Sequence, residues 1–138
     1  DPDISGSGIT LMTDTSRRIL LVEDNQVNRN MLIRRLERAG HSVITAADGA
    51  IALDMMLKER PALVLMDMNL PVKDGWTACR EAQADPKIRD IPIIALTAHA
   101  MEEDRARALD AGCADFATKP VDFPALLTVI AAAINANI

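Results

Sequence analysis

Five short apolar segments, each followed by an amphipathic stretch, constrain the fold of this chain more than any other feature of its sequence. The apolar segments lie at residues 19–22, 42–45, 62–66, 93–96 and 115–117. They carry few polar interruptions, which predicts strands covered on both faces, as in a parallel sheet. The amphipathic stretches predict helices at residues 25–39, 48–60, 76–84, 101–111 and 123–135. Strict alternation of strand and helix then predicts an α/β fold with a five-stranded parallel sheet and helices on both faces.

Length and charge restrict the possible partners. The chain has 138 residues, 49% hydrophobic and 25% charged, which is typical of one globular domain. Its net charge of −5 argues against nucleic acid as a partner. The longest mainly apolar run, residues 125–134, is about half as long as a bilayer-spanning helix, so no membrane insertion is expected.

The two cysteines indicate the compartment. Cys79 and Cys113 do not form a C-x-x-C motif, and both lie among apolar residues. We therefore expect buried thiols rather than a disulfide or a zinc site, and a reducing, cytoplasmic location.

Residues 1–17 differ from the rest of the chain. Gly and Ser are interleaved in the run DPDISGSGITL, and Met12 offers a natural start. This pattern predicts a flexible N-terminal tail or a remnant of cloning, followed by a single domain at residues 18–136.

Reactive side chains follow four of the five predicted strands. Glu23 and Asp24 follow the first strand, Asp67 the third, Thr97 the fourth and Lys119 the fifth. In an open parallel sheet of strand order 2-1-3-4-5, ligands bind at the carboxyl ends of the strands, where the first and third strands meet. We expect the three carboxylates to lie close together there, where their repulsion requires a cation. Oxygen ligands without His or Cys favour Mg²⁺, which commonly shares a phosphoryl oxygen.

A phosphoryl group would meet complementary chemistry at this edge. Asp67 is placed to act as a nucleophile and form an acyl phosphate. Lys119 could neutralise the incoming charge, while the Thr97 hydroxyl and the Ala98 N–H could donate hydrogen bonds.

Each of these residues also has an ordinary interpretation. Asp24 could begin a helix, Thr97 could cap one, and Lys119 could be a solvated loop residue. Only their coincidence at four strand ends favours one functional site.

Four separated runs resemble the receiver domain of two-component response regulators. They are VEDNQVNRNML, LMDMNLPVKDGW, IIALTAHA and CADFATKP, and the resemblance extends over residues 18–135. It implies the flavodoxin-like, or CheY-like, sheet order 2-1-3-4-5. It also implies that Asp67 is the phosphoacceptor, that Asp24 and Asp67 bind Mg²⁺ directly, and that Glu23 acts through water.

The resemblance assigns four further roles. The main-chain carbonyl of Asn69 would be another Mg²⁺ ligand, and Thr97 with the Ala98 N–H and Lys119 would bind the phosphoryl group. Thr97 would also shift on phosphorylation, and Phe116 would then swing inward. Phe116 replaces the Tyr of some relatives, so no phenolic hydroxyl is available to a partner.

As a function, the resemblance implies a signalling module that catalyses its own aspartyl phosphorylation and dephosphorylation. A histidine kinase or a histidine phosphotransfer protein would donate the phosphoryl group, and a conformational switch would pass the signal to a downstream protein. The last predicted helix reaches the end of the chain, so no output domain is expected. Met12 as a start favours a stand-alone regulator or phosphorelay intermediate over a receiver excised from a hybrid histidine kinase.

Two other functions fit less well. A haloacid dehalogenase-type Mg²⁺-dependent phosphohydrolase also uses an Asp nucleophile, but its D-x-D-x-T motif is absent after Asp67. A scaffold that is not phosphorylated would normally lack one of the acidic positions or the Lys, and all are present here.

Overall fold

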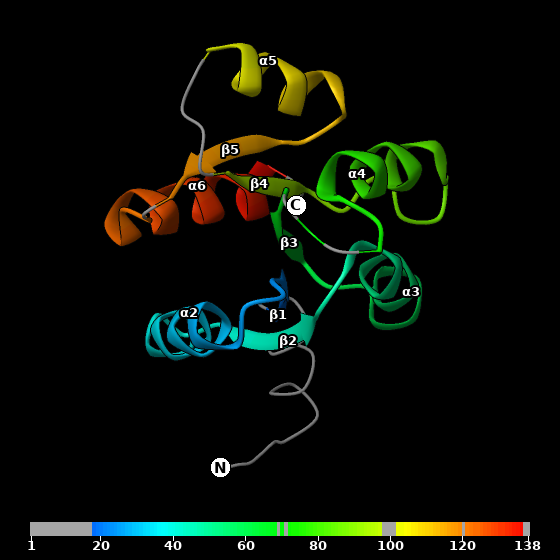
Figure 1. The fold of residues 1–138 in the computed structure, drawn as a ribbon. Coiled ribbons are helices and arrows are strands. Elements are labelled where there is room, and N and C mark those ends of the chain that lie inside the picture. The colour runs from blue at the N-terminus through cyan, green and yellow to red at the C-terminus, as the bar shows by residue number, and fades with distance from the viewer. Residues whose placement is uncertain (1–17, 69, 71, 98–101, 120, 137–138) are drawn as a thin grey trace.

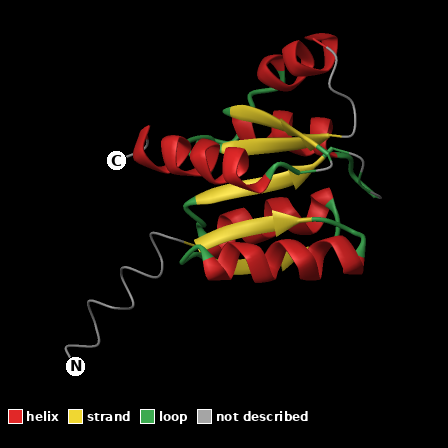
Figure 2. Ribbon diagram, turned by 90° about the vertical axis from the view of Figure 1, so that its left-hand side faces the viewer, coloured by secondary structure: helices red, strands yellow, loops and turns green. Residues whose placement is uncertain are grey.

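The parallel sheet has five strands in the order β2-β1-β3-β4-β5, as expected. The structure is a computed structural model, which describes residues 18–68, 70, 72–97, 102–119 and 121–136. The predicted tail at residues 1–17 lies outside this range. The strands are β1 (Arg18–Val22), β2 (Ser42–Ala46), β3 (Leu63–Asp67), β4 (Ile93–Thr97) and β5 (Asp115–Thr118). Their arrowheads point the same way in Figure 2.

Helices cover both faces of the sheet (Figure 1). One face packs against α2 (Gln26–Arg38) and α6 (Phe123–Ala136), through a cluster that includes Leu32, Leu36 and Ile130. The other packs against α3 (Gly49–Glu59), α4 (Gly75–Ala84) and α5 (Glu102–Asp110), through a cluster that includes Met56, Cys79 and Ala108. Among the helices that the structure describes, none is long and apolar enough to cross a membrane.

The strands differ in burial, which corrects the expectation that all five are covered on both faces. Every residue of β3 and β4 is buried, and in β1 only Arg18 is partly exposed. Only Ala46 of β2 is buried, and β5 is half-buried throughout. The reason is position, because β2 and β5 are the two edges of the sheet and each has one strand neighbour.

Polar residues fix where the helices begin. Three side chains each accept a hydrogen bond from a backbone N–H three residues later, at the N-terminus of α2, α3 and α4. These N-caps are Asn25, Asp48 and Asp74. Because each satisfies an N–H that has no partner inside the helix, each stabilises its helix start, typically by about 1 kcal/mol.

Gly75 allows α4 to begin directly against the end of β3. A Cβ at Gly75 would lie 2.7 Å from both the Asp67 carbonyl oxygen and the Met68 Cα, which are backbone atoms. The Gly75 N–H also donates to the Met68 carbonyl oxygen at 3.2 Å. The absence of a side chain therefore sets how closely α4 approaches the strand that ends at Asp67.

We expect Gly75→Ala to lower the free energy of unfolding by about 1–3 kcal/mol, because the new methyl group must displace backbone. Urea unfolding monitored by circular dichroism measures the change. Ala50→Ser adds one atom at an exposed position near the start of α3 and should change stability by less than about 0.5 kcal/mol. Equal effects of the two substitutions would contradict the close approach described here.

Candidate functional site

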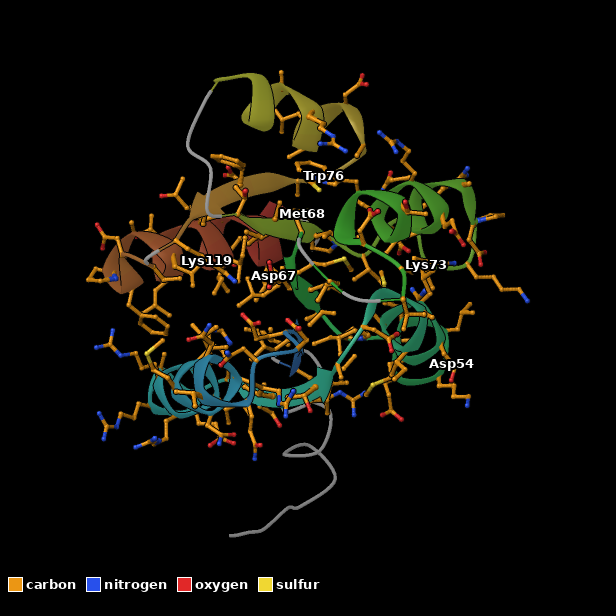
Figure 3. The ribbon with its side chains drawn as sticks, in the orientation of Figure 1. Asp54, Asp67, Met68, Lys73, Trp76 and Lys119 are labelled. Carbon is orange, nitrogen blue, oxygen red and sulfur yellow. The ribbon has the colours of Figure 1, made fainter. Side chains whose placement is uncertain are left out.

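Lys119 forms two ion pairs that join three strands at the carboxyl edge of the sheet. Its ammonium lies 3.1 Å from Oδ2 of Asp67 and 3.1 Å from Oε1 of Glu23. Asp67 is the last residue of β3, Glu23 follows β1, and Lys119 follows β5. Figure 3 shows the Asp67 and Lys119 side chains close together. The predicted cluster thus forms, with both carboxylates buried.

Backbone contacts hold Lys119 and Asp67 at this edge. The Lys119 N–H donates to the Thr97 carbonyl oxygen at 2.8 Å, which keeps the residue attached to the end of β4. The Met68 N–H donates to the Leu96 carbonyl oxygen at 3.0 Å. Both bonds extend the pairing of neighbouring strands beyond their last residues. The positions of the two ion-paired residues are therefore fixed by the backbone of the sheet.

The turn after β1 fixes Glu23. Its N–H donates to the Ala46 carbonyl oxygen at 3.1 Å, and its Oε2 accepts from the Asn25 N–H at 3.1 Å. The Arg29 guanidinium donates to the Glu23 carbonyl oxygen at 2.9 Å. Sequence reasoning misses this role of Arg29, because nothing in the spacing of residues 23 and 29 reveals that the guanidinium supports the site.

Three carboxylates could hold a divalent cation here. Oxygens of Glu23, Asp24 and Asp67 all lie within 4.8 Å of one another, with Asp24 exposed and the other two buried. Oxygens around a six-coordinate Mg²⁺ are about 3–4 Å apart, so small side-chain movements would complete such a set. The all-oxygen character of the donors also suits Mg²⁺ better than zinc. The residues present therefore fit this metal.

Burial and charge shift two pKa values in the site. Burial raises the pKa of the Glu23 carboxyl, and the hydrogen bonds from the Asn25 N–H and Lys119 oppose this rise without cancelling it. Burial alone would lower the pKa of the Lys119 ammonium, but its pairing with Asp67 and Glu23 outweighs that effect and raises it. Lys119 therefore remains a cation at neutral pH, and Asp67 and Glu23 share its single charge.

The remaining predicted residues divide into two groups. Thr97 is buried at the end of β4, where it pairs in register with Thr118 of β5. Phe116 lies in β5 and is half-buried against the cluster that packs on α3, α4 and α5. Ala98 and Asn69 fall outside the described residues, so their predicted roles stay predictions.

The chain belongs to the family of response regulator receiver domains, which it matches over residues 19–131. It is 40% identical to the response regulator PleD of Caulobacter vibrioides over 107 residues, which is 78% of this chain and 24% of PleD. This chain therefore corresponds to about a quarter of that relative. It is 34% identical over 114 residues to the polar-differentiation response regulator DivK of Brucella anthropi, which covers 83% of this chain and 93% of DivK.

Solved structures agree with this assignment. One of them is the receiver domain of the sensor histidine kinase PA1611 of Pseudomonas aeruginosa, which holds magnesium in its active site cleft. It superposes with a TM-score of 0.80 at 40% identity, and the match covers 86% of this chain and 98% of that one. Another is the receiver domain of Ssk1 of Saccharomyces cerevisiae, in complex with the phosphotransfer protein Ypd1. Its TM-score is 0.72 at 31% identity, and the match covers 79% of this chain and 82% of that one. The chain is thus a receiver domain, a signalling module with the CheY-like fold.

We expect Lys119→Met to lower the free energy of unfolding by about 1–3 kcal/mol at pH 7 without divalent cations, because two buried carboxylates lose their counter-charge. The pKa of Glu23 lies above its unfolded value, and losing Lys119 raises it further. Protonating Glu23 therefore favours the folded state, and the deficit should shrink as pH falls through its folded pKa.

Urea unfolding between pH 7 and pH 4.5 measures this dependence. Lys58→Met is the matched control, since Lys58 pairs with Asp54 at 3.0 Å on the exposed surface of α3. Its effect should stay below about 0.5 kcal/mol. A Lys119→Met deficit that grows on acidification would contradict the charge balance described here.

Proposed function

We propose that Asp67 accepts a phosphoryl group from a histidine kinase or a histidine phosphotransfer protein. The observation that carries the proposal is the Lys119 ammonium held 3.1 Å from Oδ2 of Asp67, beside the carboxylates of Glu23 and Asp24. Attack by an Asp67 oxygen on phosphorus forms an acyl phosphate, and the bond from phosphorus to the donor histidine nitrogen breaks. Positioning and charge neutralisation carry most of such a reaction.

Mg²⁺ is the proposed cofactor of this step. Asp24 and Asp67 would bind it directly, Glu23 through water, and Asn69 through its main-chain carbonyl. When bound, the metal neutralises charge on the phosphoryl oxygens. The related PA1611 receiver domain, which holds magnesium in its cleft, supports this assignment.

The chain's own residues would complete phosphoryl binding and sense the product. Lys119 would pair with a phosphoryl oxygen, and the Thr97 hydroxyl and the Ala98 N–H would donate to the others. Since Lys119 is hydrogen-bonded through its backbone to Thr97, a shift of Thr97 is passed directly to β5. Phe116, which pairs in register with Ala95, would follow by turning inward.

The site thereby catalyses both formation and hydrolysis of the aspartyl phosphate, and no separate substrate is turned over. Haloacid dehalogenase-type turnover is disfavoured because Asp67 is followed by Met68 and Asn69 rather than by a second Asp two positions on.

The surface of α2 next to the site is the proposed docking face for the phosphoryl donor. Val27 and Met31, one helical turn apart, are 76% and 44% exposed. Met31 also lines a cavity of about 220 Å³ together with Glu23, Lys119 and Val121. A partner covering this apolar surface would bring its histidine to the Asp67 edge. The Ypd1–Ssk1 complex provides a precedent for a receiver domain bound to a phosphotransfer protein.

The signal is then proposed to leave through protein–protein contacts. The face formed by α5, β5 and α6 is continuous with Lys119 and Phe116, so it is the surface most directly coupled to the site. A cytoplasmic location fits a donor that carries a phosphorylated histidine.

We expect Asp67→Asn to abolish incorporation of radiolabelled phosphate from acetyl phosphate, a small acyl-phosphate donor, because the amide cannot form the acyl phosphate. Removing Mg²⁺ with a chelator should do the same to the parent protein. Label in the parent should be released by hydroxylamine, which cleaves acyl phosphates.

Asp54→Asn is the matched control, since Asp54 is an exposed aspartate on α3 (Figure 3), and it should incorporate label like the parent. Label persisting in Asp67→Asn would identify another acceptor. Release of many phosphates per chain from a generic phosphate ester would instead favour a phosphohydrolase.

We expect Mg²⁺ to raise the thermal midpoint of the unmodified protein, because it binds the folded state and relieves carboxylate repulsion. At ten times its dissociation constant, a ligand adds about 1.4 kcal/mol of stability, or roughly 5 °C for a domain of this size. Differential scanning calorimetry measures the shift. It should disappear in Asp24→Ala and persist in Asp54→Ala, whereas an equal shift in both variants would place the metal elsewhere.

A further inference from the structure

The two cysteines of the chain, far apart in the sequence, meet in the core on the face opposite α2 and α6. The sulfurs of Cys79 and Cys113 lie 3.0 Å apart and share a hydrogen bond across a separation of 34 residues. This is closer than the roughly 3.5–4.0 Å at which non-bonded carbons pack. Both thiols are free and buried. The sequence predicted the burial of each cysteine but not their contact.

Regular backbone structure holds both cysteines in place. Cys79 lies inside α4. Cys113 follows the last turn of α5, where its N–H donates to the Ala108 carbonyl oxygen at 3.0 Å and the Gly112 N–H donates to that of Leu109 at 3.0 Å. This pair of bonds is a Schellman motif, and it needs the positive φ of 100° at Gly112. The next residue is fixed as well, because the Ala114 N–H donates to the Ile93 carbonyl oxygen at 2.7 Å.

A second contact joins α4 to α5 near the two cysteines. The Arg107 guanidinium of α5 lies 4.3 Å from the ring centroid of Trp76 in α4. Trp76 and Cys79 are three residues apart and so lie on one face of α4. Figure 3 shows Trp76 on the side of α4 toward α5. One face of α4 thus meets both α5 and the turn that follows it.

From this geometry we infer that Cys79 and Cys113 are a redox modification site, at which oxidation by a small peroxide forms an intramolecular disulfide. The disulfide would join α4 to the turn between α5 and β5. A disulfide needs its sulfurs about 2.05 Å apart, so they must approach by roughly 1 Å. The inference does not depend on the proposed phosphoryl site.

The two thiols differ in the direction in which their pKa values are shifted. The hydrogen bond from the Cys113 thiol lowers the pKa of Cys79 although burial opposes this. The same bond, together with burial, raises the pKa of Cys113. Of the two thiols, Cys79 is therefore the one that loses its proton more readily, and a proton on the Cys113 sulfur stabilises its thiolate. Cys79 is fully buried and Cys113 retains 5% of its surface exposed, so a small peroxide must enter past Cys113 through a local opening of the turn.

The chemistry balances with hydrogen peroxide as the oxidant. The Cys79 thiolate attacks one peroxide oxygen, the O–O bond breaks, and the departing hydroxide takes a proton to become water. The Cys113 sulfur then attacks the sulfenic sulfur, the S–O bond breaks, and the hydroxide leaves as water with the Cys113 proton. Two thiols are oxidised to one disulfide, and one peroxide is reduced to two waters.

The crosslink would connect the elements on either side of the carboxylate cluster. α4 begins at Gly75, against the carbonyl of Asp67, and Cys79 lies one turn further along the helix. On the other side, Cys113 leads into β5, which ends next to Lys119. The oxidised form would therefore restrain the separation of α4 and β5.

The test treats the full folded chain with hydrogen peroxide and then alkylates the remaining thiols with N-ethylmaleimide in denaturant. We expect a monomer whose mass is lower by two hydrogen atoms and that carries no alkyl group. Peptide mapping should join the Cys79 and Cys113 peptides, and dithiothreitol should restore both thiols. Cys79→Ala and Cys113→Ala must each fail to give this product.

A second measurement needs no variant. The crosslink closes a loop of more than thirty residues, so the oxidised parent should melt about 10 °C above the reduced parent. Four results would overturn the inference: both thiols still alkylated after treatment, sulfinic acid at either cysteine without a disulfide, a disulfide between two chains, or a lower melting temperature after oxidation.

Discussion

The site depends on one balance of charge, in which a single ammonium is shared by carboxylates that would otherwise repel each other. The ammonium belongs to Lys119, which follows β5 and lies 3.1 Å from both Asp67 and Glu23. Asp24 remains exposed at the rim. Because one cation cannot neutralise three carboxylates, the folded protein retains an excess of negative charge at this edge. Such an excess favours binding of a further cation, and a cation that bound here would stabilise the folded state.

The sheet provides the rigidity on which this balance rests. Buried strands β1, β3 and β4 place Glu23, Asp67 and Thr97 at one edge, and backbone hydrogen bonds continue the pairing past the strand ends. Gly75 then lets α4 begin within contact distance of the Asp67 carbonyl. A change in charge at Asp67 therefore acts on a packed helix terminus as well as on Lys119, so that electrostatics and packing are coupled at the same residue.

Much of this arrangement could be predicted from the sequence because its signals are local. Apolar segments marked the strands, and Asn25 and Asp48 marked helix starts. The strand-end rule then brought Glu23, Asp24, Asp67 and Lys119 together. Contacts that arise only from three-dimensional packing could not be predicted in this way. The support from Arg29 depends on how a turn closes, and the meeting of Cys79 with Cys113 spans 34 residues.

The contact between Arg107 and Trp76 has a practical consequence. Trp76 is the only tryptophan of the chain, and a charged guanidinium lies over its ring at the junction of α4 and α5. Indole emission is sensitive to a nearby charge, and here all of it originates at one helix junction. The protein therefore contains an intrinsic fluorophore whose spectrum follows the spacing of these two helices in solution, without any attached dye.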